Sequence, residues 1–318
     1  MEIKNRYDFV YYVEASNANP NGDPDADNQP RIDPVDRHGL MTDVSQKRKV
    51  RNFVEMTKSR EDGYEIFIKE RSVLNHAIEG AYSNEEVKSA LEAWKKVKGP
   101  ERSRLGLKHP EDLARDWLCK KFFDIRCFGA VLSTGSEEKD ESDAKSKIKL
   151  KAGQVRGPVQ FTFSRSIDPV DLDMSTITRV AVTNEKDVDK ERTMGRKHFV
   201  SYGLYRMHGF VSPYFAEKTF FGNSDLELLF EALTKMYWHG NSSSKAGMNV
   251  RGLYLFKHDT PLGEAHAHSL FERITEAKLA EDKSPRSFSD YSVLFDGKSV
   301  EVGESLQAAP GVTLTRRC

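Results

Sequence analysis

The sequence has few cysteines, no excess of either charge and no long apolar run. Its three cysteines, Cys119, Cys127 and Cys318, form no CxxC pair, which excludes a zinc ribbon and a thioredoxin-type redox site. No apolar run approaches the roughly 20 residues that a membrane-spanning helix needs. The N-terminal residues also lack the apolar core of a signal peptide. We therefore expect free thiols, a cytoplasmic location and no membrane partner.

The charge balance is neutral, because 49 lysines and arginines are matched by 49 aspartates and glutamates. A dedicated nucleic-acid-binding protein often carries a basic excess, but binding depends on where the charges cluster, so neutrality does not exclude it. The 318 residues can form one large domain with insertions or two ordinary domains. Because the sequence contains no GxSxG, Walker A or GxGxxG motif, it offers no visible constellation for nucleophilic catalysis.

Strand-like sequence predicts several strands. They lie at residues 7–14, 125–132, 155–164, 177–182, 199–211 and 248–257, and the first and third of them alternate. In the third of these, Val159, Phe161 and Phe163 alternate with polar residues, which places all three aromatic or aliphatic side chains on one face.

Helical spacing predicts helices between these strands. One begins near Asp43, which can cap it, others lie at 111–123 and 225–239, and Ser83 with Glu86 forms a capping box inside an apparent insertion at about 64–118. Two strand–helix–strand units around an antiparallel sheet would make an α+β fold of the ferredoxin-like type, which is also the RRM scaffold.

Three polar segments are long enough to have a function of their own. Residues 16–39 are rich in glycine, proline and asparagine, and such long connections are commonly functional or disordered. Residues 135–147 carry almost no apolar side chains and are predicted to be a mobile loop. Residues 183–198 are long enough for a projecting hairpin or flap.

A basic segment follows the first long loop. On a helical wheel, Lys47, Arg48 and Arg51 fall within one arc of about 100°, separate from the apolar stripe of Val50, Phe53 and Val54. Three cations on one side of a docked helix suit phosphate binding, because each neutralised phosphate releases condensed counterions. An ordinary solvated helix face would show the same pattern.

Two further segments offer contacts for nucleic acid. In the polar excursion, Met194 stands beside Arg196 and Lys197, so an apolar tip could wedge between bases while the cations hold phosphates. A charged surface hairpin would have a similar composition. Lys245, in a loop of small residues after the last predicted helix, suits close approach to a polyanion but also suits any loop.

The acidic segment Asp23, Asp25 and Asp27 starts like a calcium loop. Its sixth position is Asn28 instead of glycine and its twelfth is Pro34 instead of glutamate, so an EF-hand is excluded. A magnesium-dependent RNase that uses Asp23 or Asp33 stays an alternative. The histidines at 258, 266 and 268, with Glu264 nearby, match no metal site with recognisable spacing, and we expect no bound metal and no cofactor.

Several motifs in the same order resemble the backbone subunit of type I CRISPR Cascade complexes, most closely the type I-C branch. They are residues 19–25 (NPNGDPD), 29–33 (QPRID), 42–51 (TDVSQKRKVR), 126–130 (RCFGA), 153–161 (GQVRGPVQF), 194–205 (MGRKHFVSYGLY) and 252–259 (GLYLFKHD). They are spread along most of the chain.

This resemblance implies a single RRM-like palm over residues 1–318, helical fingers at about 64–118 and a thumb hairpin at about 183–198. It implies a non-catalytic protein that polymerises along CRISPR RNA and presents it to a target DNA strand, together with other Cascade subunits and a recruited helicase-nuclease. The residues that would contact RNA are Arg31, Lys47, Arg48, Arg51, Arg126, Arg156, Met194, Arg196, Lys197 and Lys245. An RNase and an oligomer without nucleic acid are the competing hypotheses.

Overall fold

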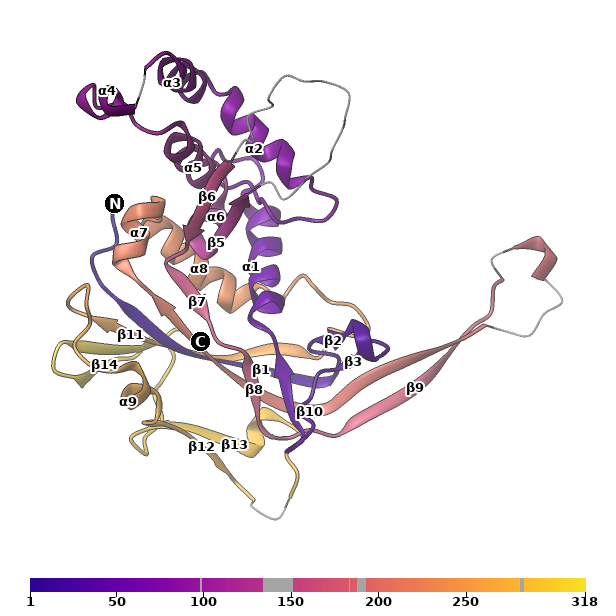
Figure 1. The fold of residues 1–318 in the computed structure, drawn as a ribbon. Coiled ribbons are helices and arrows are strands. Elements are labelled where there is room, and N and C mark those ends of the chain that lie inside the picture. Colours follow the sequence, from indigo (N-terminus) through magenta and orange to yellow (C-terminus); the bar gives the residue numbers. More distant parts are fainter. Residues whose placement is uncertain (98, 134–150, 183, 188–192, 281–282) are drawn as a thin grey trace. The chain divides into compact units, whose positions relative to one another are not determined.

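The computed structural model describes residues 1–318 except 98, 134–150, 183, 188–192 and 281–282. The chain is an α+β protein that divides into two compact units (Figure 1). Unit 1 comprises Met1–Arg6, Val50–Gln160 and Phe210–Ala232, and unit 2 comprises Tyr7–Lys49, Phe161–Gly209 and Leu233–Cys318. The α+β prediction is therefore confirmed.

Unit 2 is built on a large sheet with the order β14-β15-β11-β1-β10-β8-β4, to which β7 and β9 add by pairing with β10. The pairings of β1 with β11, β11 with β15, and β8 and β9 with β10 are antiparallel. The bounds in this unit are β1 (Tyr7–Ala18), β2 (Gly22–Asp23), β3 (Gln29–Pro30), β4 (His38–Met41), β8 (Ser164–Pro169), β9 (Leu172–Arg179), β11 (Met248–His258), α9 (Ala267–Phe271), β12 (Ile274–Lys278), β13 (Tyr291–Phe295), β14 (Ser305–Ala309) and β15 (Val312–Arg316).

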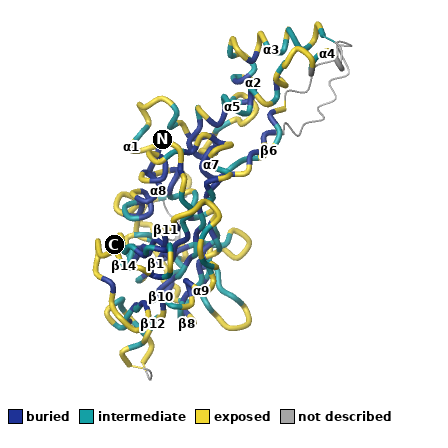
Figure 2. The backbone as a smooth tube through the Cα atoms, turned by 90° about the vertical axis from the view of Figure 1, so that its left-hand side faces the viewer, coloured by how far each residue is buried: buried dark blue, intermediate teal, exposed yellow. Residues whose placement is uncertain are grey.

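Strand β1 is the most buried part of this sheet, as its aromatic and β-branched sequence predicts (Figure 2). Its Phe9 ring packs edge-on against Phe161, with ring centroids 5.9 Å apart. The hydroxyl of Tyr11 donates to the carbonyl of Leu233 at 2.6 Å, and that of Tyr237 donates to Gln46 at 3.0 Å. Both buried hydroxyls are satisfied. The Tyr11 bond ties Leu233 to the central strand of unit 2, and the Tyr237 bond joins the chain just after Leu233 to Gln46.

Four elements contain boundaries between the units: α1 (Asp43–Lys58), β7 (Val159–Phe161), β10 (Thr193–Val211) and α8 (Asn223–Lys235). The helix predicted from Asp43 is confirmed, but its cap is Thr42, whose hydroxyl accepts from the Ser45 amide at 3.2 Å. The helix predicted at 225–239 is confirmed with earlier limits at both ends.

Unit 1 is mainly helical. It contains α2 (Leu74–Ser83), α3 (Glu85–Lys96), α4 (Gly99–Arg104), α5 (Pro110–Lys121), α6 (Phe123–Phe128), β5 (Gly129–Ser133), β6 (Lys151–Arg156) and α7 (Pro213–Thr219). Ile78, Val87 and Leu118 belong to one buried cluster, so α2, α3 and α5 share a core. The capping box predicted from Ser83 is wrong, because Asn84 caps α3 by accepting from the Glu86 amide at 3.1 Å.

Three of the predicted strands are wrong in part. The one at 177–182 ends with β9 at Arg179. The run at 125–132 begins as helix α6 and becomes strand only at Gly129, where the backbone has a positive φ of 82°. A Cβ at Gly129 would also lie 2.4 Å from the carbonyl oxygen of Val155, so only glycine fits this turn. The run at 155–164 breaks into three strands, and the predicted mobile loop at 135–147 lies outside the described residues.

The C-terminal part of unit 2 is attached to the sheet through Arg206 on β10. Its guanidinium donates to Glu276 at 2.9 Å and to the carbonyl of Phe271 at 2.6 Å. The neighbouring His208 stacks on the Phe271 ring at 4.4 Å, and burial, followed by the nearby Arg206 charge, lowers the pKa of His208 to about 4. Across the described residues, no helix is long and apolar enough to cross a membrane.

Candidate nucleic-acid interface

The long loop after β1 is folded by its own hydrogen bonds. The side chain of Asp23 accepts from the Asp25 amide and from the Arg31 guanidinium, each at 3.1 Å, and the Asn28 amide donates to the Asp23 carbonyl at 2.8 Å. A Cβ at Gly22 would lie 1.9 Å from the Asn28 side-chain oxygen and 3.0 Å from the Asn28 carbonyl oxygen, so a larger residue here would force Asn28 to shift. The acidic motif is thus used to shape a tight turn that fixes the Arg31 side chain.

A second loop, which precedes β11, is clamped to the first by Lys245. The Lys245 ammonium donates to the carbonyls of Asn19 and Pro20, the latter at 2.9 Å, and the Asn19 amide donates to Ser244 at 2.9 Å. Burial, followed by the nearby Lys49 charge, lowers the pKa of Lys245 to about 8. A bound anion would raise the pKa of Lys245 again, because it stabilises the charged form of the lysine.

Lys49 is a cation that the sequence patterns did not single out. Its ammonium lies 5.6 Å from the centroid of the Tyr237 ring, and burial lowers the pKa of this lysine too. Lys49 lies inside the basic segment. A helical wheel shows only which residues of one helix share a side, so it cannot show that Lys49 lies near Lys245. Only the fold brings the two ammonium groups near each other.

Strands β9 and β10 leave the sheet as a two-stranded ribbon (Figure 1). Most of β9 is exposed, and so are the apolar side chains of Met174, Ile177 and Met194. At the base of this ribbon, Lys197 donates to the Ser243 carbonyl, and His198 lies 3.7 Å from the Asp27 carboxylate. The ribbon base, the loop after β1 and the loop before β11 therefore meet.

The register divides the predicted ribbon contacts between two faces. Met194 pairs with Thr178 and Arg196 pairs with Thr176, so Met194 and Arg196 share a face. Lys197 pairs with Ser175 on the opposite face, where Ile177 stands across from Gly195. Lys197 therefore cannot flank Met194, as the composition suggested, because neighbouring residues of a strand point to opposite sides.

The basic helix presents only part of the predicted cation cluster. Arg48 is exposed, while Lys47 forms an ion pair with Asp43 at 2.9 Å. Arg51 is buried and forms an ion pair with Asp124 at 2.8 Å, with 8% of its side chain exposed. The prediction that three cations project together from this helix is therefore wrong, because the buried Asp124 carboxylate draws Arg51 inward.

Arg126 and Arg156 belong to unit 1. Arg126 is buried in α6, where its guanidinium donates to both carboxylate oxygens of Asp225, at 2.8 and 3.2 Å. Arg156 is exposed at the end of β6, and its guanidinium lies 5.4 Å from the Phe215 ring. Of these two, only Arg156 has a guanidinium that a ligand can reach without first breaking a buried ion pair.

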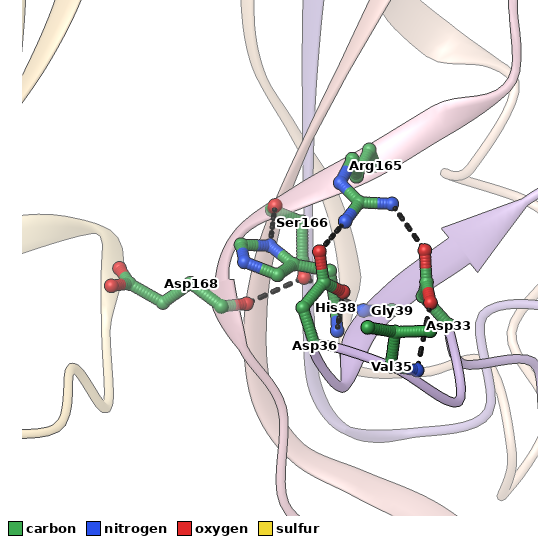
Figure 3. Close-up of polar contacts among 8 residues, drawn as sticks. All are labelled: Asp33, Val35, Asp36, His38, Gly39, Arg165, Ser166 and Asp168. Atoms are coloured by element: carbon green, nitrogen blue, oxygen red, sulfur yellow. Dashed lines mark hydrogen bonds and ion pairs between the residues drawn. The ribbon is translucent and has the colours of Figure 1, made fainter.

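The carboxylates that would serve an RNase are engaged in structural contacts. Asp33 accepts from the Val35 amide at 2.9 Å and from Arg165 at 3.0 Å, and the same guanidinium also binds Asp36 (Figure 3). The backbone hydrogen bond from Val35, followed by the bond from Arg165, lowers the pKa of Asp33. Arg165 thus fixes the loop at 33–38 onto β8.

Within the part of the chain that the structure describes, no group of three or more histidine, cysteine, aspartate or glutamate side chains is arranged to hold a metal ion. Buried His258 accepts from the Glu264 amide at 2.9 Å and contacts Asp8 at 3.0 Å through its other ring nitrogen. The RNase hypothesis finds no support in these contacts.

The chain is thus an α+β protein in which a projecting ribbon and two polar loops bring cations together on one unit. Its sequence matches the family described as CRISPR-associated protein Cas7 over residues 5–296, which is most of the chain. The chain belongs to the Cas7 family.

The individual relatives are each less than 30% identical to this chain. The chain is 29% identical over 239 residues to the "CRISPR-associated protein Cas7" of Haloferax volcanii, and this match covers 72% of the chain but only 63% of that relative. Similar solved structures are a "CRISPR RNA-guided surveillance complex, pre-nicking" (TM-score 0.45, 13% identity, 79% of this chain and 78% of that one) and a "CRISPR RNA-guided surveillance complex" (0.39, 12%, 79% and 68%). A third is the type III-B Cmr-beta complex bound to cognate target RNA (0.38, 10%, 79% and 61%).

Proposed function

We propose that this chain is the non-catalytic RNA-binding backbone subunit of a cytoplasmic type I CRISPR complex, of the type I-C branch. Copies of the chain polymerise along CRISPR RNA and present it for pairing with a target DNA strand. Other Cascade subunits and a recruited helicase-nuclease complete the assembly, and no membrane takes part. Membership of the Cas7 family supports this proposal.

The observation that carries the proposal is the meeting of cations from three separate segments of unit 2. Arg31 is held by the turn after β1, Lys245 clamps that loop, and Lys197 binds the loop that contains Lys245. Single-stranded nucleic acid is commonly bound by such a positive surface together with exposed apolar side chains that contact the bases. Met194, 68% exposed on the ribbon, supplies one of these.

The proposed fold has three parts. The sheet order β11-β1-β10-β8 supports an RRM-like palm, since it has the first and third strands of a ferredoxin-like repeat at its centre. Helices α2 to α5 supply the fingers, and the β9–β10 ribbon supplies the thumb.

The proposed RNA contacts leave out the two predicted arginines whose guanidinium groups are buried in ion pairs. Phosphates are held by Arg31, Lys47, Arg48, Arg196, Lys197 and Lys245, and Arg156 extends this set in unit 1. Met194 packs against bases from the same ribbon face as Arg196. We assign Arg51 and Arg126 to the stability of unit 1, because each is buried against a carboxylate.

A salt titration of guide binding tests the proposal. The plot of log affinity against log salt has a negative slope. Each phosphate contact that is lost makes this slope less steep by about 0.7 for a single strand. We therefore expect Arg48→Ala to weaken binding of CRISPR RNA and to flatten this slope, while Lys298→Ala, which removes an exposed cation from a turn of unit 2, changes neither. Equal slopes for wild type and Arg48→Ala would contradict the assignment of Arg48, and a wild-type chain without RNA affinity would contradict the function.

A further inference from the structure

The Nζ atom of Lys245 is held by backbone groups alone. It donates to the carbonyls of Asn19 and Pro20, the latter at 2.9 Å, and no carboxylate of the described residues forms an ion pair with it. An ammonium has three N–H donors, so one of them is not used by these two carbonyls. A neutral amine keeps two donors and has a lone pair in the third position. Lys245 can therefore lose a proton without losing either hydrogen bond.

Two further cations lie around this amine. Burial, followed by the nearby Lys49 charge, lowers the pKa of Lys245 to about 8. Lys49 Nζ lies beside Gly240, 3.2 Å from the place of a Cβ there, and Lys197 donates to the Ser243 carbonyl in the same loop. At pH 7.5 about a quarter of Lys245 is thus neutral, against about 0.1% of an ordinary lysine. A desolvated lysine next to another cation is a common form of nucleophilic lysine.

The loop at 240–247 leaves this amine open to a small molecule. Its sequence, GNSSSKAG, has no large side chain apart from the lysine itself. Ser242 and Ala246 are exposed, and both Lys245 and Lys49 are half-buried, so each keeps part of its side chain in contact with solvent. The cations attract anions, and the neutral amine reacts with electrophiles. A small molecule that is both an anion and an electrophile suits this pair best.

We propose that Lys245 is a site of acylation by small acyl phosphates, with Lys49 holding their phosphate group. The neutral Nζ attacks the acyl carbon and a C–N bond forms. The bond from that carbon to the phosphate oxygen breaks, inorganic phosphate leaves with the electron pair, and the surplus proton on nitrogen passes to water. The bound phosphate raises the pKa of Lys245 in part, so the gain in rate is smaller than the neutral fraction alone indicates.

Acylation would remove one of the proposed RNA contacts, and this consequence rests on the proposed function. An acyl-lysine is neutral, and its amide has a single N–H that can donate to only one of the Asn19 and Pro20 carbonyls. We expect weaker RNA binding and a salt dependence less steep by about 0.7 for the lost contact. Bound RNA should in turn shield Lys245 from acylation.

Treatment of the RNA-free chain with acetyl phosphate tests the inference. The full-length wild type is incubated at pH 7.5, and its acetylated lysines are mapped over time by mass spectrometry. Lys298, an exposed lysine in a turn of unit 2, is the internal control. We expect Lys245 to be acetylated about tenfold faster than Lys298, because its larger neutral fraction is partly offset by the weaker nucleophilicity of a less basic amine. Acetylation of Lys245 no faster than that of Lys298 would overturn the inference.

Two acyl donors separate phosphate binding by Lys49 from its effect on the Lys245 pKa. Lys49→Met removes a positive charge, so the pKa of Lys245 rises and both donors react more slowly. Acetyl phosphate should be slowed about threefold more than acetic anhydride, since only acetyl phosphate carries a phosphate for Lys49 to hold. Equal slowing of the two donors would overturn the role of Lys49.

RNA distinguishes failure of the inference from failure of the proposed function. CRISPR RNA that is bound before acetylation should protect Lys245 and leave Lys298 unchanged. Lys245→Gln, which is neutral like acyl-lysine, should lose RNA affinity, whereas Lys245→Arg should retain it, and equal affinities would overturn the consequence for RNA binding. A wild type that is acetylated rapidly at Lys245 but does not bind RNA would overturn the proposed function and support the acylation site.

Discussion

Replacement of Arg51 by alanine is expected to destabilise unit 1 and to leave the salt dependence of RNA binding unchanged. Arg51 lies at the end of the basic segment, but its guanidinium binds Asp124 at 2.8 Å, and only 8% and 1% of the two side chains are exposed. Removing the arginine leaves a carboxylate buried without its cation. A buried charge that loses its partner costs more than an exposed pair contributes.

The magnitude follows from what Asp124 retains. Breaking a buried ion pair by removing one partner typically costs about 3–5 kcal/mol. The Asp124 carboxylate still accepts from the amides of Phe67 at 2.8 Å and Ile68 at 3.0 Å, so part of its stabilisation survives. We therefore expect the free energy of unfolding to fall by about 3 kcal/mol, near the lower end of that range.

Urea denaturation and RNA binding at several salt concentrations, measured on the same preparations, provide the assay. With an m-value of about 3 kcal/mol/M, this loss lowers the urea midpoint by about 1 M. Arg48→Ala is the matched control, because Arg48 lies in the same helix and is exposed. We expect a stability change within about 0.5 kcal/mol for this control, together with the flatter salt dependence described above.

Two results would refute the reasoning about Arg51. One is an Arg51→Ala protein with unchanged stability, which would mean that the buried pair contributes nothing. The other is an Arg51→Ala protein whose salt slope falls as much as that of Arg48→Ala, which would identify Arg51 as a phosphate contact. A double variant, Arg51→Met with Asp124→Asn, should recover part of the stability that Arg51→Ala removes, because it eliminates the unpaired charge and keeps an acceptor for one amide.

Three further outcomes are expected. Arg126→Met should lower the free energy of unfolding by about 3 kcal/mol or more, because Asp225 loses a bidentate partner, and thermal denaturation at one pH measures this. RNA affinity of the wild type should fall as the pH rises through about 8, the pKa of Lys245, since the charged lysine is lost there, whereas Lys245→Arg should stay flat from pH 7 to 9. Asp33→Ala should give the same product pattern as wild type when the assembled complex is incubated with complementary RNA and magnesium, and regular cleavage that disappears in this variant would support the RNase instead.

The sequence determined the main elements of the chain, because their signals are local. The aromatic and β-branched run of β1, the helical spacing of α1 and α8 and the strand-like run of β11 each depend on near neighbours. The order of several motifs along the chain also pointed to the Cas7 family, which the family match now shows.

Local patterns failed where a distant group decides the conformation. The run at 125–132 has strand-like composition, yet its first residues fold as α6. There Arg126 forms an ion pair with Asp225, which lies about a hundred residues further along the chain. Phe163 follows the alternating pattern of a buried face, yet it is exposed because Thr162 and His208 fix a break in the strand.

The candidate site shows the same division between sequence and structure. Composition alone located the basic segment, the glycine-rich loop and the Met194 hairpin, since each is unusual over a short stretch of chain. It could not tell that Arg51 is drawn into a buried pair with Asp124, that Lys49 lies near Lys245, or that strand register separates Lys197 from Met194. Those facts depend on groups far apart in sequence that meet only when the backbone is folded, and tertiary structure therefore decided which cations are accessible and which stabilise the fold.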